Sequence, residues 1–139
     1  MKKSTLQHLR IPFSYFLLPV FLFGYSIDTN SPVLKFWIVF FILHFLTYPA
    51  SNGYNSYFDQ DEGSIGGLRN PPKATLQLYF VSLLLDVIGI ALALLLINLY
   101  FAAAIMVYGL ISTAYSHPAI RLKKYPYLSW IVAGTFQGW

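Results

Sequence analysis

One long stretch of this sequence carries almost no charge. Between residues 74 and 116 the only charged side chain is Asp86, and the stretch is long enough for two membrane-spanning helices of about 20 residues each. A charged side chain at the centre of a bilayer costs about 2.5–3.5 kcal/mol on the insertion scale. The whole chain is 57% hydrophobic and 10% charged, whereas soluble domains carry about 25% charged residues. We therefore predict an all-α integral membrane protein.

The apolar runs predict a transmembrane bundle with four complete helices and the start of a fifth. We expect the spans at residues 11–26, 33–58, 76–97 and 100–115, with a fifth run from about residue 128. The fifth run reaches Trp139 before it is long enough to cross a bilayer. We therefore expect residues 1–139 to form a single transmembrane domain that is the N-terminal part of a longer one.

The N-terminus is basic and precedes an apolar run, which is also typical of a secretory signal peptide. However, Pro12 and Pro19 interrupt the run, and no small-residue cleavage site follows it. We therefore interpret the run as a retained first helix.

The basic residues predict the orientation of the helices. With four crossings, eight of the nine lysines and arginines fall on one face, and only Lys35 falls on the other. Cytoplasmic loops carry such an excess, so we expect a multi-pass protein of the cell (inner) membrane whose N-terminus is cytoplasmic. The net charge of +4 is too small and too scattered to indicate nucleic-acid binding.

Three of the five acidic residues lie within four positions after the second expected span: Asp59, Asp61 and Glu62. Asn55 lies one helical turn before Asp59, so the two share a helix face. Mg²⁺ prefers one or two carboxylates together with substrate phosphates and water to a closed protein cage. The cluster therefore favours a Mg²⁺–diphosphate site over a structural calcium site, and an EF-hand is excluded because Asn70 occupies the twelfth position. An ordinary helix cap followed by a solvated loop is the alternative.

This stretch resembles the first aspartate-rich motif of the UbiA superfamily of intramembrane prenyltransferases, Asn-x-x-x-Asp-x-x-x-Asp. Asn55 and Asp59 match its first two positions, and the motif lies at the end of the second helix, as in the family. Gly63 occupies the third position, so Asp61 or Glu62 would replace the missing ligand. Many members carry an acid where Asp61 stands. The sequence Arg-Asn-Pro at residues 69–71 also resembles the family's Arg-Pro element.

The resemblance implies Mg²⁺-dependent transfer of an isoprenyl group from its diphosphate to a hydrophobic or aromatic acceptor in the membrane, as in quinone biosynthesis. Members have about nine spans of this length. Their second aspartate-rich motif would lie beyond Trp139. We therefore expect the 139-residue chain alone to be inactive, because half of the metal site would be missing.

A basic stretch after the fourth expected span is the second candidate site. Residues 115–124, Tyr-Ser-His-Pro-Ala-Ile-Arg-Leu-Lys-Lys, resemble the segment after the family's fourth helix. A diphosphate leaving group needs cationic partners, because charge builds on its oxygens as the C–O bond breaks. The candidates are Arg121 and Lys123, with Tyr115 as a further donor. Alternatively, these basic residues only enforce topology.

Two polar residues inside the apolar runs are interpreted as structural. Asp86 could line a substrate cavity, but we favour a protonated or hydrogen-bonded structural role with His44 as a possible partner.

The rival to the enzyme hypothesis is a small non-catalytic polytopic protein, either a transporter or an assembly subunit, with an acidic cytoplasmic loop. Replacement of Asp59 by alanine would leave the function of such a protein unchanged.

Overall fold

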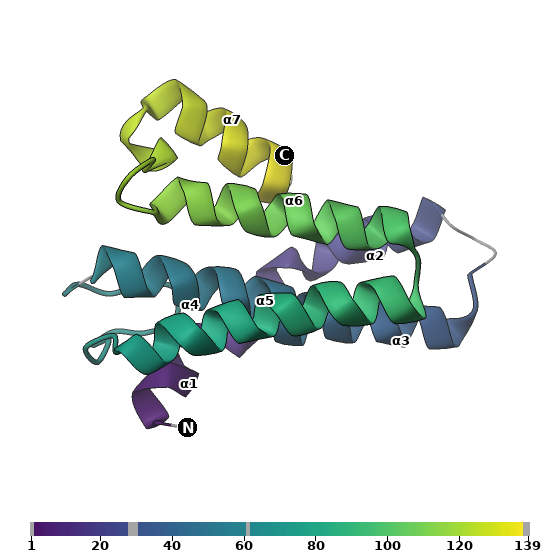
Figure 1. Ribbon diagram of the computed structural model, residues 1–139, viewed down its shortest axis with the longest axis horizontal. Helices are drawn as coiled ribbons and strands as arrows, with labels where there is room; N and C mark the ends of the chain where they lie inside the picture. The colour runs from purple at the N-terminus through teal and green to yellow at the C-terminus, as the bar shows by residue number, and fades with distance from the viewer. Residues whose placement is uncertain (1, 28–30, 61, 138–139) are drawn as a thin grey trace.

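The computed structural model describes residues 2–27, 31–60 and 62–137, and within them every regular element is helical. Figure 1 shows the arrangement, in which the long helices run side by side and α7 folds back along α6. In chain order the elements are α1 (Lys3–Leu9), the 3₁₀ segment η1 (Ile11–Leu17), α2 (Leu18–Ile27), α3 (Val33–Phe41), the π-helical segment η2 (Ile42–Thr47), α4 (Tyr48–Asp59), α5 (Leu76–Leu96), α6 (Leu99–Ser116), the 3₁₀ turn η3 (Leu122–Lys124) and α7 (Pro126–Gln137).

Four continuous helical stretches are long and apolar enough to cross a membrane: Lys3–Ile27, Val33–Asp59, Leu76–Leu96 and Leu99–Ser116. The last three agree with the expected spans to within one residue. Helix α7 is the expected fifth helix. The prediction of an all-α membrane bundle with four complete helices and a fifth beginning is therefore confirmed.

The first span starts earlier than expected. Helix α1 precedes it and ends at Arg10, whose backbone is left-handed with φ of 46°. Pro12 then lies at the start of η1, where its missing N–H is tolerated. Thr5 on α1 donates from Oγ1 to Oε1 of Gln77 on α5 at 3.1 Å, so the extra helix is tied to the rest of the bundle.

The second span changes its winding halfway along. In η2 the helix widens into a π turn, and the N–H of Tyr48 donates to the carbonyl of Leu43, five residues back. Pro49 follows directly, and because it has no N–H it cannot donate to the carbonyl of Phe45. A proline next to a π turn therefore accounts for the break in the regular ladder, and such turns occur often at functional sites.

The bundle has two ends of different character. At the motif end, Figure 1 shows the N-terminus, the end of α4, the start of α5 and the α6–α7 connection close to one another. At the distal end lie the α2–α3 and α5–α6 connections. The basic segments that the sequence assigns to one face therefore do come together at the motif end.

Candidate functional site

Asn55 and Asp59 lie one turn apart at the end of α4. The Oδ1 atom of Asn55 is buried and has no hydrogen-bond partner in the described part of the chain. Gln60, in the left-handed region with φ of 49°, ends the helix directly after Asp59 through a 3.2 Å bond from its N–H to the carbonyl of Ser56. Glu62 is exposed in the loop that follows. Asp61 lies outside the described residues.

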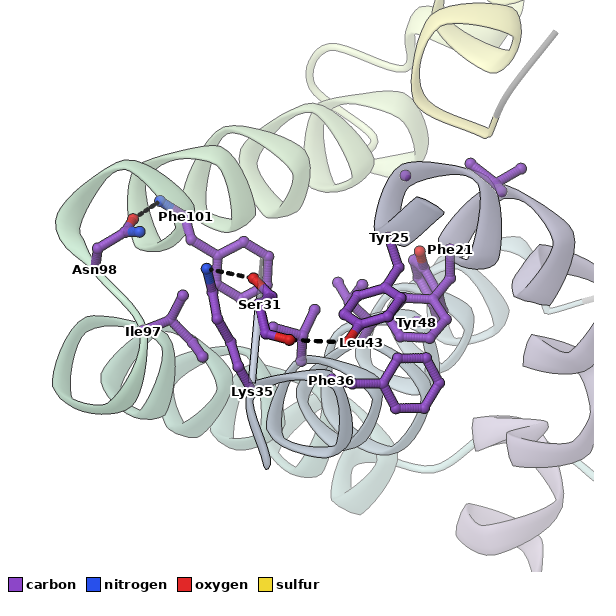
Figure 2. A pocket seen from close by; sticks show the side chains of 13 residues that line it. Phe21, Tyr25, Ser31, Lys35, Phe36, Leu43, Tyr48, Ile97, Asn98 and Phe101 are labelled. Carbon is purple, nitrogen blue, oxygen red and sulfur yellow. Dashed lines mark hydrogen bonds between the residues drawn. The ribbon is translucent and has the colours of Figure 1, made fainter. Parts of the chain in front are cut away.

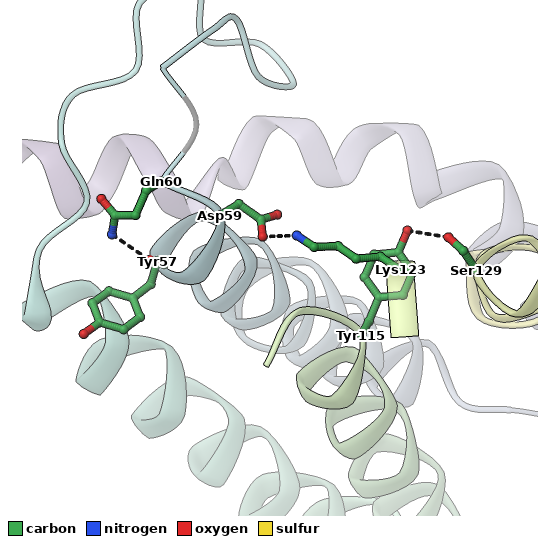
Figure 3. Close-up of polar contacts among 6 residues, drawn as sticks. All are labelled: Tyr57, Asp59, Gln60, Tyr115, Lys123 and Ser129. Atoms are coloured by element: carbon green, nitrogen blue, oxygen red, sulfur yellow. Dashed lines mark hydrogen bonds and ion pairs between the residues drawn. The ribbon is translucent and has the colours of Figure 1, made fainter. Parts of the chain in front are cut away.

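Lys123 forms an ion pair with Asp59, from Nζ to Oδ1 (Figure 3). Each side chain is only 21% exposed, so the pair is largely withdrawn from solvent. Lys123 lies on η3, in the connection between α6 and α7, and its contact with Asp59 brings that connection next to the end of α4. The two stretches proposed from the sequence therefore form one site.

The other two candidates from the basic stretch, Arg121 and Tyr115, do not share the position of Lys123. Arg121 precedes η3 in the left-handed region with φ of 47°, and its side chain is exposed. The hydroxyl of Tyr115 lies 2.9 Å from Oγ of Ser129 on α7 (Figure 3). Tyr115 also lines a small cavity of about 70 Å³ together with Asn55. Of the three candidates, Lys123 is the one that forms an ion pair with a described residue of the acidic motif.

A larger cavity opens beside Asn55, and we call it the inner chamber. Its volume is about 410 Å³, and it lies between η1, α4, α6 and α7. Its polar side chains include Ser51, Asn52 and Asn55, and its walls include Phe13, Phe16 and Leu17. The chamber is therefore lined by both polar and apolar side chains.

The donor atoms suit Mg²⁺ better than a metal that needs a full protein cage. In the described residues no group of three or more His, Cys, Asp or Glu side chains could hold a metal. The available donors are the carboxylate of Asp59 and the unpaired Oδ1 of Asn55. A buried acceptor without a partner costs about 1–3 kcal/mol, so a bound cation would relieve this cost. Because Mg²⁺ completes its shell with water and phosphate oxygens, two protein oxygens fit it.

Sequence reasoning missed the contribution of the N-terminal segment. Arg10 donates from Nη2 to Oδ1 of Asn52 at 3.2 Å, next to the inner chamber. It also packs against the loop after the motif, where a Cβ on Gly66 would lie 2.8 Å from Nη1 of Arg10. From the sequence, Arg10 is one of the eight basic residues that predict topology. The helical spacing of Asn52 and Asn55 could have identified Asn52.

Asp86, His44 and the aromatic residues nearest the motif pack against neighbouring side chains or helices. The carboxylate of Asp86 lies against Gly109 of α6, where a Cβ would be 3.1 Å from Oδ2. The ring of His44 lies 4.5 Å from that of Phe40 and 5.7 Å from that of Phe21, measured between centroids. Within the described residues, no hydrogen bond joins His44 to Asp86. The aromatic residues nearest the motif pack against Tyr79 of α5: Tyr54, Tyr57 and Phe58.

Comparison with known proteins gives one positive result. The model of the UbiA prenyltransferase family matches residues 16–139, which include both candidate stretches. The chain has no significant match among curated proteins and none among solved structures. The family match covers most of the chain and agrees with the all-α membrane bundle described above. The chain therefore belongs to the UbiA prenyltransferase family.

Proposed function

We propose that this protein transfers an isoprenyl group from its diphosphate to a hydrophobic or aromatic acceptor within the membrane, and that the transfer depends on Mg²⁺. The observation that carries the proposal is the buried, unpaired Oδ1 of Asn55 beside the ion pair of Asp59 and Lys123. Together they offer oxygen donors for a cation and an ammonium group for an anion, and Asn55 also lines a chamber with both polar and apolar walls. An isoprenyl diphosphate has the matching chemistry.

Each candidate residue has a distinct role in this scheme. Asn55 and Asp59, with Asp61 or Glu62, would hold Mg²⁺, which would neutralise charge on the diphosphate. Lys123 moves from Asp59 to the phosphate oxygens when the substrate arrives, and Arg121 and Tyr115 supply further donors. As the C–O bond breaks, its electron pair leaves with the diphosphate, and these donors stabilise the growing charge. The acceptor then forms the new carbon–carbon bond and releases a proton.

The inner chamber protects the allylic fragment. Phe13 and Phe16 present aromatic rings to the cavity, and ring faces attract cations. An apolar wall also excludes water, which would otherwise capture the fragment. The acceptor enters the same chamber, and quinone biosynthesis is the pathway class that we propose for it.

We propose that the protein lies in the cell (inner) membrane and that its motif end faces the cytoplasm. Basic residues of three segments gather there, which supports this orientation under the positive-inside rule.

The test is binding of a non-hydrolysable farnesyl diphosphate analogue to the complete gene product in lipid nanodiscs. We expect wild-type protein to bind only with Mg²⁺ present, and Asp59→Asn to lose at least about tenfold in affinity because a charged partner is removed. Asp86→Asn is the matched control, since Asp86 packs against Gly109 away from the motif. Equal binding by the Asp59 variant and the wild type would favour the non-catalytic rival.

A further inference from the structure

Tyr48 lines two separate cavities. One is the inner chamber at the motif end. The other, which we call the distal chamber, also has a volume of about 410 Å³ and lies between α2, α3 and the α5–α6 connection. Among the described residues that line the inner and distal chambers, Tyr48 alone lines both. Its side chain therefore stands between a cavity that reaches the acidic motif and one that does not.

The π turn brings Tyr48 onto the cavity-lining face of its helix. Lys35, Val39 and Leu43 line the distal chamber at the α-helical spacing of four residues. The next lining residue is Tyr48, one residue further than that spacing predicts. The bond from the N–H of Tyr48 to the carbonyl of Leu43 marks this wider turn. Without the π turn, Thr47 would follow Leu43 on this face.

The ring of Tyr48 is held from two sides. Its centroid lies 5.3 Å from the ring of His44 on its own span and 5.9 Å from the ring of Tyr108 on α6, with both contacts edge-to-face. Such aromatic pairs favour defined geometries. The ring therefore bridges two helices at the boundary between the chambers.

The distal chamber suits hydrocarbon. Figure 2 shows Phe21 and Phe36 near Tyr48 on one side and Ile97 near Asn98 on the other. Two of its polar side chains form hydrogen bonds with Ser31. Tyr25 donates from its hydroxyl to the carbonyl of Ser31 at 3.2 Å, and Lys35 donates from Nζ to Oγ of Ser31 at 3.1 Å.

We propose that Tyr48 limits the length of isoprenyl tail that the protein accepts, and that the distal chamber takes the end of a longer tail once this ring moves or is removed. The inference rests on the proposed function. A diphosphate held at Asn55 and Asp59 directs its tail into the inner chamber, whose lining reaches Tyr48. A short tail ends before the ring, whereas a long tail has to pass it. The ring therefore determines specificity and does not act on the reacting bond.

The experiment measures Mg²⁺-dependent affinity for non-hydrolysable geranyl, farnesyl, geranylgeranyl and octaprenyl diphosphate analogues, using the complete gene product in nanodiscs. In Tyr48→Ala we expect the ratio of octaprenyl to geranyl affinity to rise at least about tenfold, because several more methylene-sized groups become buried. Tyr48→Phe keeps the ring and should retain the wild-type ranking. Tyr100→Ala is the matched control, since Tyr100 is 86% exposed on α6.

A second variant tests whether the distal chamber receives the tail. Adding Leu43→Trp to Tyr48→Ala narrows that chamber one helical turn from residue 48 and should reduce the gain for the octaprenyl analogue, while geranyl binding persists and shows that the protein is folded. A Tyr48→Ala protein with the wild-type ranking, or a gain that the Trp substitution does not reduce, overturns this inference and leaves the proposed function standing. If wild-type protein binds none of the analogues, both are overturned.

Discussion

The motif end and the distal end of this bundle are built from different interactions. At the motif end, polar contacts join segments that are distant in sequence, such as His8 with the carbonyl of Pro72 at 2.6 Å and Lys123 with Asp59. At the distal end, aromatic rings pack around an apolar cavity, with Phe21 and Phe36 at a centroid distance of 5.0 Å. The bundle therefore has the same polarity along its axis as an isoprenyl diphosphate.

The two ends also differ in how closely their helices pack around glycine. Substitutions of these glycines should give the largest change in stability. A Cβ on Gly53 of α4 would lie 2.3 Å from Oγ of Ser82 and 3.0 Å from Leu78 Cδ1 and Leu9 Cδ2. We expect Gly53→Val to lower the free energy of unfolding by about 1–3 kcal/mol or more, since overpacking forces the helices apart. Thermal unfolding in detergent measures this loss.

The matched substitution lies in α2, towards the distal end. Nothing lies within 4 Å of a Cβ on Gly24, so Gly24→Ala should keep or raise stability, by up to about 1 kcal/mol from the lost flexibility of the unfolded chain. Equal losses in both variants would show that the two ends pack alike.

The two lysines on opposite ends give the second test. Lys123→Met removes the cation that contacts Asp59, and we expect affinity for the diphosphate analogue to fall about tenfold to a hundredfold, as for other hydrogen bonds to charged groups. Lys35→Met removes a cation whose described partner is Ser31, far from the motif. It should leave that affinity within about twofold. Binding titrations of both variants with the diphosphate analogue, at one salt concentration, compare these affinities. A large loss of affinity in Lys35→Met would contradict the proposal that the diphosphate binds at the motif end.

Serine hydroxyls give the smallest expected effect. Ser51 and Ser112 share a 2.5 Å hydrogen bond between α4 and α6, so Ser112→Ala should cost about 0.6 kcal/mol of stability, the average for such contacts in membranes. Within the described residues, the exposed hydroxyl of Ser26 donates to the carbonyl of Phe23 in its own helix, at 2.7 Å. Ser26→Ala should therefore leave the unfolding midpoint unchanged. A midpoint that falls equally in both variants would rule out a specific interhelical role for Ser112.

Much of the fold follows from hydropathy alone. A bilayer excludes unpaired backbone groups, so an apolar run of sufficient length becomes a helix whatever its neighbours do. This explains why the span that begins at residue 76 agrees so closely with α5. The first span was placed less well because Arg10 and Pro12 break it into local turns, and the packing of α1 against α5 decides whether the segment before them is helical.

Hydrophobicity and the helical repeat are local properties, so the sequence is enough to predict that the chain crosses a membrane and that Asn55 and Asp59 share a helix face. The choice of Lys123 over Arg121 as the partner of Asp59 depends on how η3 lies relative to α4, so it could be read only from the tertiary structure. The tertiary structure also shows that Tyr48 divides two chambers. A π turn and a partner ring on another helix set that position, and no local pattern encodes either of them.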